Sequence, residues 1–131
     1  MNNDFNLYDI ISPLLKEQRY AERYRYTDVM TALAPNYGIL PTTYTIKGVP
    51  YVYPAKEAPI EITPYLGKIA DNKDPMTYLN TKFCASPLVI YIPKNEVAKT
   101  PIRIENTLSG EQDTMVVRRI LVIMEENAEA T

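Results

Sequence analysis

Residues 87–93 read PLVIYIP, an apolar run of five residues enclosed by two prolines. The run is rich in β-branched and aromatic residues and too short for a typical helix, so we expect a strand over residues 88–92. Both faces of this strand are apolar, whereas a strand with one side in water alternates apolar and polar residues. The segment therefore predicts a buried strand that needs cover on both faces.

Shorter stretches around this run alternate with period two, as half-buried strands do. They lie at residues 42–47, 60–63 and 101–106, and a further short strand is expected at 51–53, after a turn at Gly48. The last and longest strand is expected at 114–124. Together these stretches predict a mainly β (α+β) fold, a small β-sandwich or barrel of about six strands with an N-terminal helical arm.

The last expected strand is apolar on both faces apart from two arginines. One face carries Val116, Arg118, Ile120, Val122 and Met124, and the other carries Val117, Arg119, Leu121 and Ile123. The residues expected inside the sandwich are Leu88, Ile90, Ile92, Val116, Ile120 and Val122. A sandwich covers only one face of such a strand, so the second cover is either the N-terminal helices or another chain.

The first third of the sequence has helical spacing and capping signals. Ser12-Pro13 is typical of an N-cap followed by proline at the first helical position, and Thr27 or Asp28 is the expected cap of a later short helix. Another short helix is expected after Asp74-Pro75. The domain organisation that follows is an N-terminal helical arm at 1–35, a β-rich body at 42–124 and an acidic C-terminal tail at 125–131.

Residue content removes most catalytic and cofactor chemistry. The chain has no histidine and one cysteine, Cys84, so a hydrolase triad, a Cys–His pair and a His/Cys zinc site are unavailable within one chain. Its four glycines are far apart and form no phosphate-binding loop. Asp71 and Asp74 do not fit the calcium-loop pattern and are expected in a solvated loop. We expect no enzyme, no cofactor and no metal.

Charge and hydropathy exclude other classes of protein. The net charge of −2 exerts no long-range attraction on nucleic acid or on an anionic membrane. The first residues lack the basic and apolar regions of a secretory signal, and the longest apolar run, at 120–124, is too short to cross a bilayer. We therefore expect a soluble protein made inside the cell.

Tyrosine dominates the aromatic residues, with 11 tyrosines against two phenylalanines and no tryptophan. Residues 19–26 interleave arginine and tyrosine, which suits either nucleic-acid binding or a helix that docks on protein. The acids interleaved with them favour docking on protein. The residues expected to bind a partner are Tyr8, Tyr20, Tyr24, Tyr26, Arg118 and Arg119.

In architecture, the helical arm and β-rich body resemble small virion proteins of tailed bacteriophages, of the auxiliary capsid or head-to-tail joining type. The richness in Asn, Lys, Ile and Tyr is similar to that of crassvirus-like phages. The resemblance implies a structural virion protein without catalysis, made in the host cytoplasm and bound in repeated copies to other capsid or connector proteins. No membrane is expected as a partner, and the charge balance disfavours nucleic acid. The alternative is a nucleic-acid-binding or regulatory module that uses residues 19–26.

Overall fold

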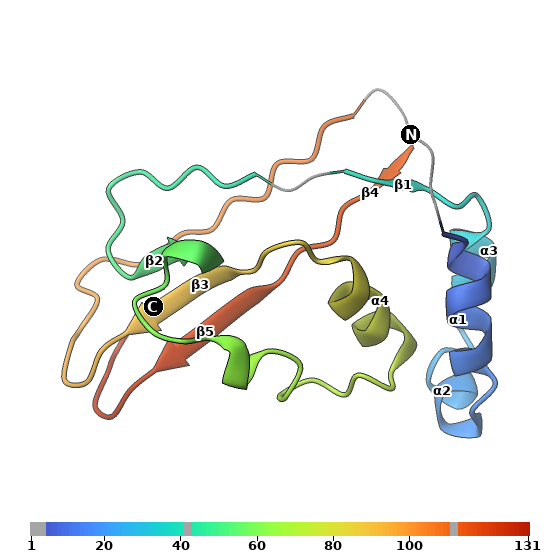
Figure 1. The fold of residues 1–131 in the computed structure, drawn as a ribbon, viewed down its shortest axis with the longest axis horizontal. Helices are drawn as coiled ribbons and strands as arrows, with labels where there is room; N and C mark the ends of the chain where they lie inside the picture. Colours follow the sequence, from blue (N-terminus) through green and yellow to red (C-terminus); the bar gives the residue numbers. More distant parts are fainter. Residues whose placement is uncertain (1–4, 41–42, 111–112) are drawn as a thin grey trace. The chain divides into compact units, whose positions relative to one another are not determined.

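The computed structural model describes residues 5–40, 43–110 and 113–131 (Figure 1). The chain divides into two units that interleave along the sequence. Unit 1 takes the residues up to Leu40, Tyr65–Phe83 and Gly110–Val117, and unit 2 takes the remainder. The division into an arm, a body and an acidic tail stays a prediction.

Unit 1 is mainly helical. Its helices are α1 (Leu7–Leu15), α2 (Gln18–Arg23), α3 (Val29–Leu33) and α4 (Pro75–Phe83), and a parallel pair of short strands joins β1 (Gly38–Ile39) to β4 (Thr114–Met115). The buried core consists of Leu7, Ile11, Val29, Leu33 and Leu79. The rings of Phe5 and Phe83 lie 4.5 Å apart at its edge.

Side-chain caps determine where these helices begin. Asn6 accepts a hydrogen bond from the Asp9 amide at the start of α1, and Asp28 accepts one from the Thr31 amide at the start of α3. Asp28 is one of the two caps predicted there, and the helix predicted after Asp74-Pro75 is α4. The predicted helix start at Ser12-Pro13 is wrong, because α1 continues through Pro13. Leu7 and Ile11, one turn apart, are both fully buried, so packing keeps this segment in one helix.

Unit 2 contains a three-stranded sheet with the order β2 (Val52–Pro54), β3 (Leu88–Ile92) and β5 (Ile120–Met124). β2 pairs antiparallel to β3, and β5 pairs parallel to it. All five residues of β3 are buried, as the PLVIYIP segment predicts. Two 3-10 turns, η1 (Ala55–Glu57) and η2 (Thr63–Tyr65), lie between β2 and α4.

One face of β3 is covered by segments of the same unit. Leu88, Ile90 and Ile92 form a buried cluster with Val52. The apolar side chains packed against this cluster are Tyr44, Ile46, Tyr51, Ala98, Ile102 and Ala128. Cover for this face therefore comes from within the chain.

The predicted mainly β sandwich or barrel of about six strands is wrong. The described residues form two small sheets of two and three strands and no closed barrel, and the four α-helices hold more residues than the five strands. Residues 43–47, 60–62 and 101–106 belong to no strand, and Thr42 lies outside the described residues. Prolines at 59, 64 and 101 lack the amide that a strand ladder needs.

The period-two pattern nevertheless identified which side chains face the core. Tyr44 and Ile46 pack on the cluster around β3, whereas Thr45 and Lys47, which alternate with them, are exposed. An extended segment can bury alternate side chains without pairing its backbone with a neighbour. The alternation here therefore records burial and not a hydrogen-bonded strand.

The predicted long strand at 114–124 is interrupted. It forms β4 in unit 1 and β5 in unit 2, and the chain passes from one unit to the other between Val117 and Arg118. Leu88, Ile90 and Ile92 are buried as predicted, and Val116 is half-buried. Ile120 and Val122 were predicted inside, but they are 44% and 53% exposed, while Leu121 and Ile123 are buried.

The register explains this reversal on β5. Ile120 pairs with Leu88 and Val122 with Ile90, so these side chains share one face of the sheet. The segments that bury Leu88 and Ile90 leave β5 exposed on this face.

A pair of alanine substitutions tests this orientation of β5. Leu121→Ala removes a buried side chain and should lower the free energy of unfolding by about 2–5 kcal/mol. Val122→Ala changes an exposed side chain and should lower it by less than about 1 kcal/mol. Urea denaturation of both variants measures the difference. Equal losses, or a larger loss in Val122→Ala, would contradict the observed orientation.

Candidate functional site

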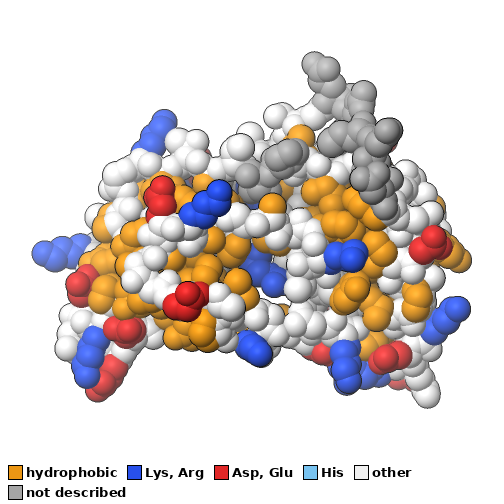
Figure 2. All heavy atoms as spheres, in the orientation of Figure 1, with side chains coloured by type: hydrophobic (Ala, Val, Ile, Leu, Met, Phe, Trp, Pro, Cys, Tyr) orange, Lys and Arg blue, Asp and Glu red, His pale blue; other side chains and the backbone are white. Residues whose placement is uncertain are grey.

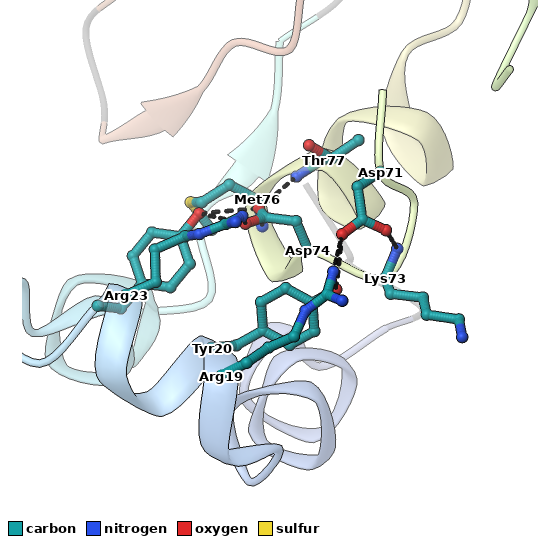
Figure 3. A network of polar contacts seen from close by, with 9 residues as sticks. Arg19, Tyr20, Arg23, Asp71, Lys73, Asp74, Met76 and Thr77 are labelled. Carbon is teal, nitrogen blue, oxygen red and sulfur yellow. Dashed lines mark hydrogen bonds and ion pairs between the residues drawn. The ribbon is translucent and has the colours of Figure 1, made fainter. Parts of the chain in front are cut away.

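Candidate residues gather in two places, a polar network in unit 1 and a groove in unit 2. The network joins α2 to the start of α4 through Asp74, which is only 5% exposed (Figure 3). Arg23 Nη1 lies 2.5 Å from Asp74 Oδ2, and the Tyr24 hydroxyl donates to the same carboxylate at 2.8 Å. The amides of Met76 and Thr77 donate to Asp74 Oδ1 at 3.0 and 3.3 Å. Asp74 thus caps α4 and binds α2.

A second carboxylate, Asp71, binds the arginine and the tyrosine that lie one turn earlier on α2. It forms an ion pair with Arg19 and accepts a hydrogen bond from the Tyr20 hydroxyl at 2.7 Å. The Tyr20 ring is fully buried, and the guanidinium carbons of Arg19 and Arg23 lie 4.6 and 5.6 Å from its centroid. Arg19 and Tyr20 therefore bind one of the two acids that precede α4. Arg23 and Tyr24, four residues later, bind the other.

The network controls the protonation of its members. Burial opposes the charged form of Asp74, but the hydrogen bonds from Tyr24, Arg23, Thr77 and Met76 outweigh it and lower its pKa. Burial and the hydrogen bond to Asp74 raise the pKa of Tyr24 to about 12. Tyr24 consequently stays a neutral donor and Asp74 an ionised acceptor at neutral pH. The arrangement stabilises structure and supplies no acid or base that titrates near pH 7.

Asp71 and Asp74 were expected in a solvated loop, and Asp74 is buried instead. The signal for its role was the Asp74-Pro75 helix start, since an aspartate at that position accepts the first free amides of a helix. The arginine and tyrosine partners on α2 could not be assigned from spacing, because they lie about 50 residues away in the chain.

The predicted partner-binding tyrosines fall into two groups. Tyr20 and Tyr24 are held in the network, whereas Tyr8 and Tyr26 are 52% and 88% exposed. The alternative of nucleic-acid binding through residues 19–26 is not supported, because the Tyr20 ring is buried and Arg19 and Arg23 pair with acids. The role of these residues in binding a protein partner stays a prediction.

Arg118 and Arg119 lie at a groove of about 660 Å³ in unit 2. Its walls come from residues 43–49, 102–107 and 118–120, with Val52 and Leu88 among the lining residues. Arg118 donates to Asn106 Oδ1 across the groove wall. Among the described residues, the groove is lined by one carboxylate, Glu105, and by four cationic side chains, Lys47, Arg103, Arg118 and Arg119. The groove is therefore locally cationic in a chain whose net charge is −2.

The groove continues onto an exposed apolar strip on β5. Ile120 lines the groove, and Ile120, Val122 and Met124 are 44%, 53% and 44% exposed. Hydrophobic side chains reach the surface over the three-stranded sheet as well as over the helices of unit 1 (Figure 2). Sequence reasoning missed this strip, because an apolar strand residue is ordinarily assigned to the core.

Within residues 5–40, 43–110 and 113–131, no group of three or more His, Cys, Asp and Glu side chains is placed to hold a metal ion. None of the helices observed there combines the length and the hydropathy that crossing a bilayer requires.

One family model is similar to part of this chain. The family model of the SufBD protein N-terminal region matches residues 52–104, less than half of the sequence. The matched stretch runs from β2 through α4 and β3 to the segment 102–104 at the groove. No curated protein and no solved structure matches the chain significantly.

The match corrects several predictions made from the sequence. The family is not one of phage virion proteins, so the resemblance to auxiliary capsid or head-to-tail joining proteins is wrong. The structural virion function and the virion location that the resemblance implied are wrong for the same reason.

Acid unfolding tests the network around Asp74. Because the pKa of Asp74 is lowered in the folded protein, its carboxylate stabilises the fold above its ordinary pKa, near 4, and this contribution is lost as the pH falls. Asp74→Asn should lower the free energy of unfolding at pH 7 by about 1.5–3 kcal/mol and flatten its fall in acid. Circular dichroism at 222 nm reports on unit 1, which holds the four α-helices found in the described residues.

Asp113→Asn is the matched control, since Asp113 is an exposed acid of the same unit. It should leave both the stability at pH 7 and the acid profile unchanged. If Asp74→Asn and the parent protein lose stability in parallel below pH 4, Asp74 is not the carboxylate that governs acid unfolding.

Proposed function

We propose that this protein is a non-catalytic, partner-binding component of iron–sulfur cluster assembly. The observation that supports the proposal is the match of residues 52–104 to the SufBD protein N-terminal region, a family of iron–sulfur cluster assembly. The matched residues include β3, the buried centre of the sheet, and α4, which Asp74 caps. The resemblance thus covers elements on which both units depend.

The ligand content of the chain supports a binding role over a cluster-holding one. Iron–sulfur clusters are held mainly by cysteine thiolates, commonly four, with histidine as the usual substitute. This chain has one cysteine, the half-buried Cys84, and no histidine. A single chain therefore supplies at most one such ligand. In this proposal the cluster is cargo whose ligands come mainly from another protein.

Non-catalytic action through protein contacts agrees with the rest of the chemistry. The buried titratable groups of the network, Asp74 and Tyr20, are committed to hydrogen bonds within unit 1. The groove and the strip on β5 offer a surface on which a protein partner can bind. Partner binding is the activity that these features support best.

Binding to a SufBD protein and an effect on cluster transfer are the direct tests. The purified chain should co-elute with a SufBD protein in anaerobic size-exclusion chromatography. It should also change the rate at which that protein delivers a cluster to an apo-ferredoxin, followed by visible absorbance. Serum albumin at the same concentration is the control for a non-specific effect. No association together with an unchanged transfer rate would overturn the proposal.

Substitution of the one thiol separates binding from cluster ligation. Cys84→Ser and Cys84→Ala should both retain association with the SufBD protein and the effect on transfer, because the proposed role needs no ligand from this chain. Iron and acid-labile sulfide in the complex should also be unchanged. A loss of iron in both variants, with association intact, would show that Cys84 ligates the cluster.

A further inference from the structure

We propose that the outer edge of β5 and the adjoining groove bind an extended, acidic peptide segment of a partner protein by adding a strand to the sheet. The surface consists of the exposed strip Ile120, Val122 and Met124 and of the groove that begins at Ile120. Nothing in this surface depends on iron–sulfur chemistry, so its test is separate from that of the proposed function.

The hydrogen bonds of β5 show which of its backbone groups face outward. Leu88 donates its amide to the Arg119 carbonyl at 3.0 Å, and the Glu125 amide donates to the Ile92 carbonyl at 3.0 Å. In a parallel pair, alternate residues direct both backbone groups to the same neighbour. Residues 119, 121, 123 and 125 thus face β3, and the amides and carbonyls of Ile120, Val122 and Met124 face away from it.

β5 is an edge strand of the sheet, since the strand order among the described residues is β2-β3-β5. Natural edge strands usually carry charged side chains or prolines that prevent pairing with another chain. The five residues ILVIM of β5 include neither. Outward backbone groups beside an exposed apolar strip are the features that an added strand uses, the first for affinity and the second for specificity.

Charge identifies the kind of peptide that fits. Lys47 and Arg103 are exposed at the groove, where Arg118 and Arg119 also lie, and Glu105 is the only acid among the lining residues that the structure describes. The opposite end of β5 continues into Glu125 and Glu126. The surface is therefore cationic beside Ile120 and only weakly acidic beyond Met124, where Lys94 forms an ion pair with Glu126. An incoming strand with apolar alternate residues and carboxylates at the end next to the groove matches both features.

The probes are fluorescein-labelled peptides with the core Val-Thr-Val-Thr-Val. Three glutamates precede the core in one peptide and follow it in another, and two control peptides carry lysines in the same places. Fluorescence anisotropy with the full chain should show binding of a glutamate peptide that weakens as salt rises, and no binding of either lysine peptide. The preferred glutamate peptide reports whether the added strand is parallel or antiparallel. Failure of both glutamate peptides to bind would overturn the proposal.

Charge reversal tests the groove. The double variant Lys47→Glu with Arg103→Glu should weaken the glutamate peptide roughly tenfold or more. Lys56→Glu with Lys99→Glu makes the same change at two exposed lysines of unit 2 that do not line the groove, and it should leave binding nearly unchanged. An equal loss of affinity in both double variants would show that peptide binding depends on the net charge of the protein and not on the groove.

Removal of one outward amide tests strand addition. Val122→Pro deletes the amide that faces away from β3, a position at which an edge strand accepts proline, whereas Val122→Thr retains it. The proline variant should lose peptide binding, and the threonine variant should bind within roughly twofold of the parent. Methylation of alternate backbone amides in the peptide removes hydrogen bonds that the peptide donates to β5, and it leaves the protein unaltered. Binding that survives both changes would exclude strand addition.

A second copy of this chain is the competing occupant of the edge. Sedimentation velocity over a range of concentrations distinguishes it. A monomer that binds the glutamate peptide supports the proposal. A dimer that Val122→Pro dissociates, and that the peptide does not displace, would show that β5 pairs with another copy and would overturn it.

Discussion

Unit 2 is organised by the need to bury a strand whose five side chains are all apolar. β3 is covered on one face by segments from before and after it in the chain, and both of its edges are paired, with β2 and with β5. Its pairing with β5 is parallel, so the intervening chain has to cross back to the start of the strand. The extended segment around Ile102, on this connection, is also part of the cover. One requirement therefore accounts for the sheet, its cover and the connection.

Local signals predicted the parts of the fold that depend on neighbouring residues. The prolines around residues 88–92 indicated β3, Asp28 indicated the start of α3, and Asp74-Pro75 indicated the start of α4. Each is a short-range effect of a missing amide, a capping oxygen or a run of β-branched residues. Where packing opposed a local signal, as at Pro13, the signal misled.

Pairing and partnership between distant segments could not be predicted in the same way. The apolar pattern of 114–124 is continuous, yet β4 and β5 belong to different units. Residues 101–106 alternate like a strand, and Ile102 is half-buried, but these residues belong to no strand. At the candidate site, the arginines of the groove were singled out because charge is unusual in an apolar strand. The exposed side of β5 was missed because its two apolar faces look alike in the sequence.

The interleaving of the two units has a consequence for synthesis of the protein. Each unit takes a segment from the last quarter of the chain, β4 for unit 1 and β5 for unit 2. Neither unit can be completed while the ribosome is still making the central part of the sequence. β3 emerges about 30 residues before β5, one of the two strands that pair with it, and at ordinary elongation rates this edge of β3 stays unpaired for seconds. Until β5 follows, the apolar residues of β3 can associate with other apolar segments, which is a common origin of aggregation during folding.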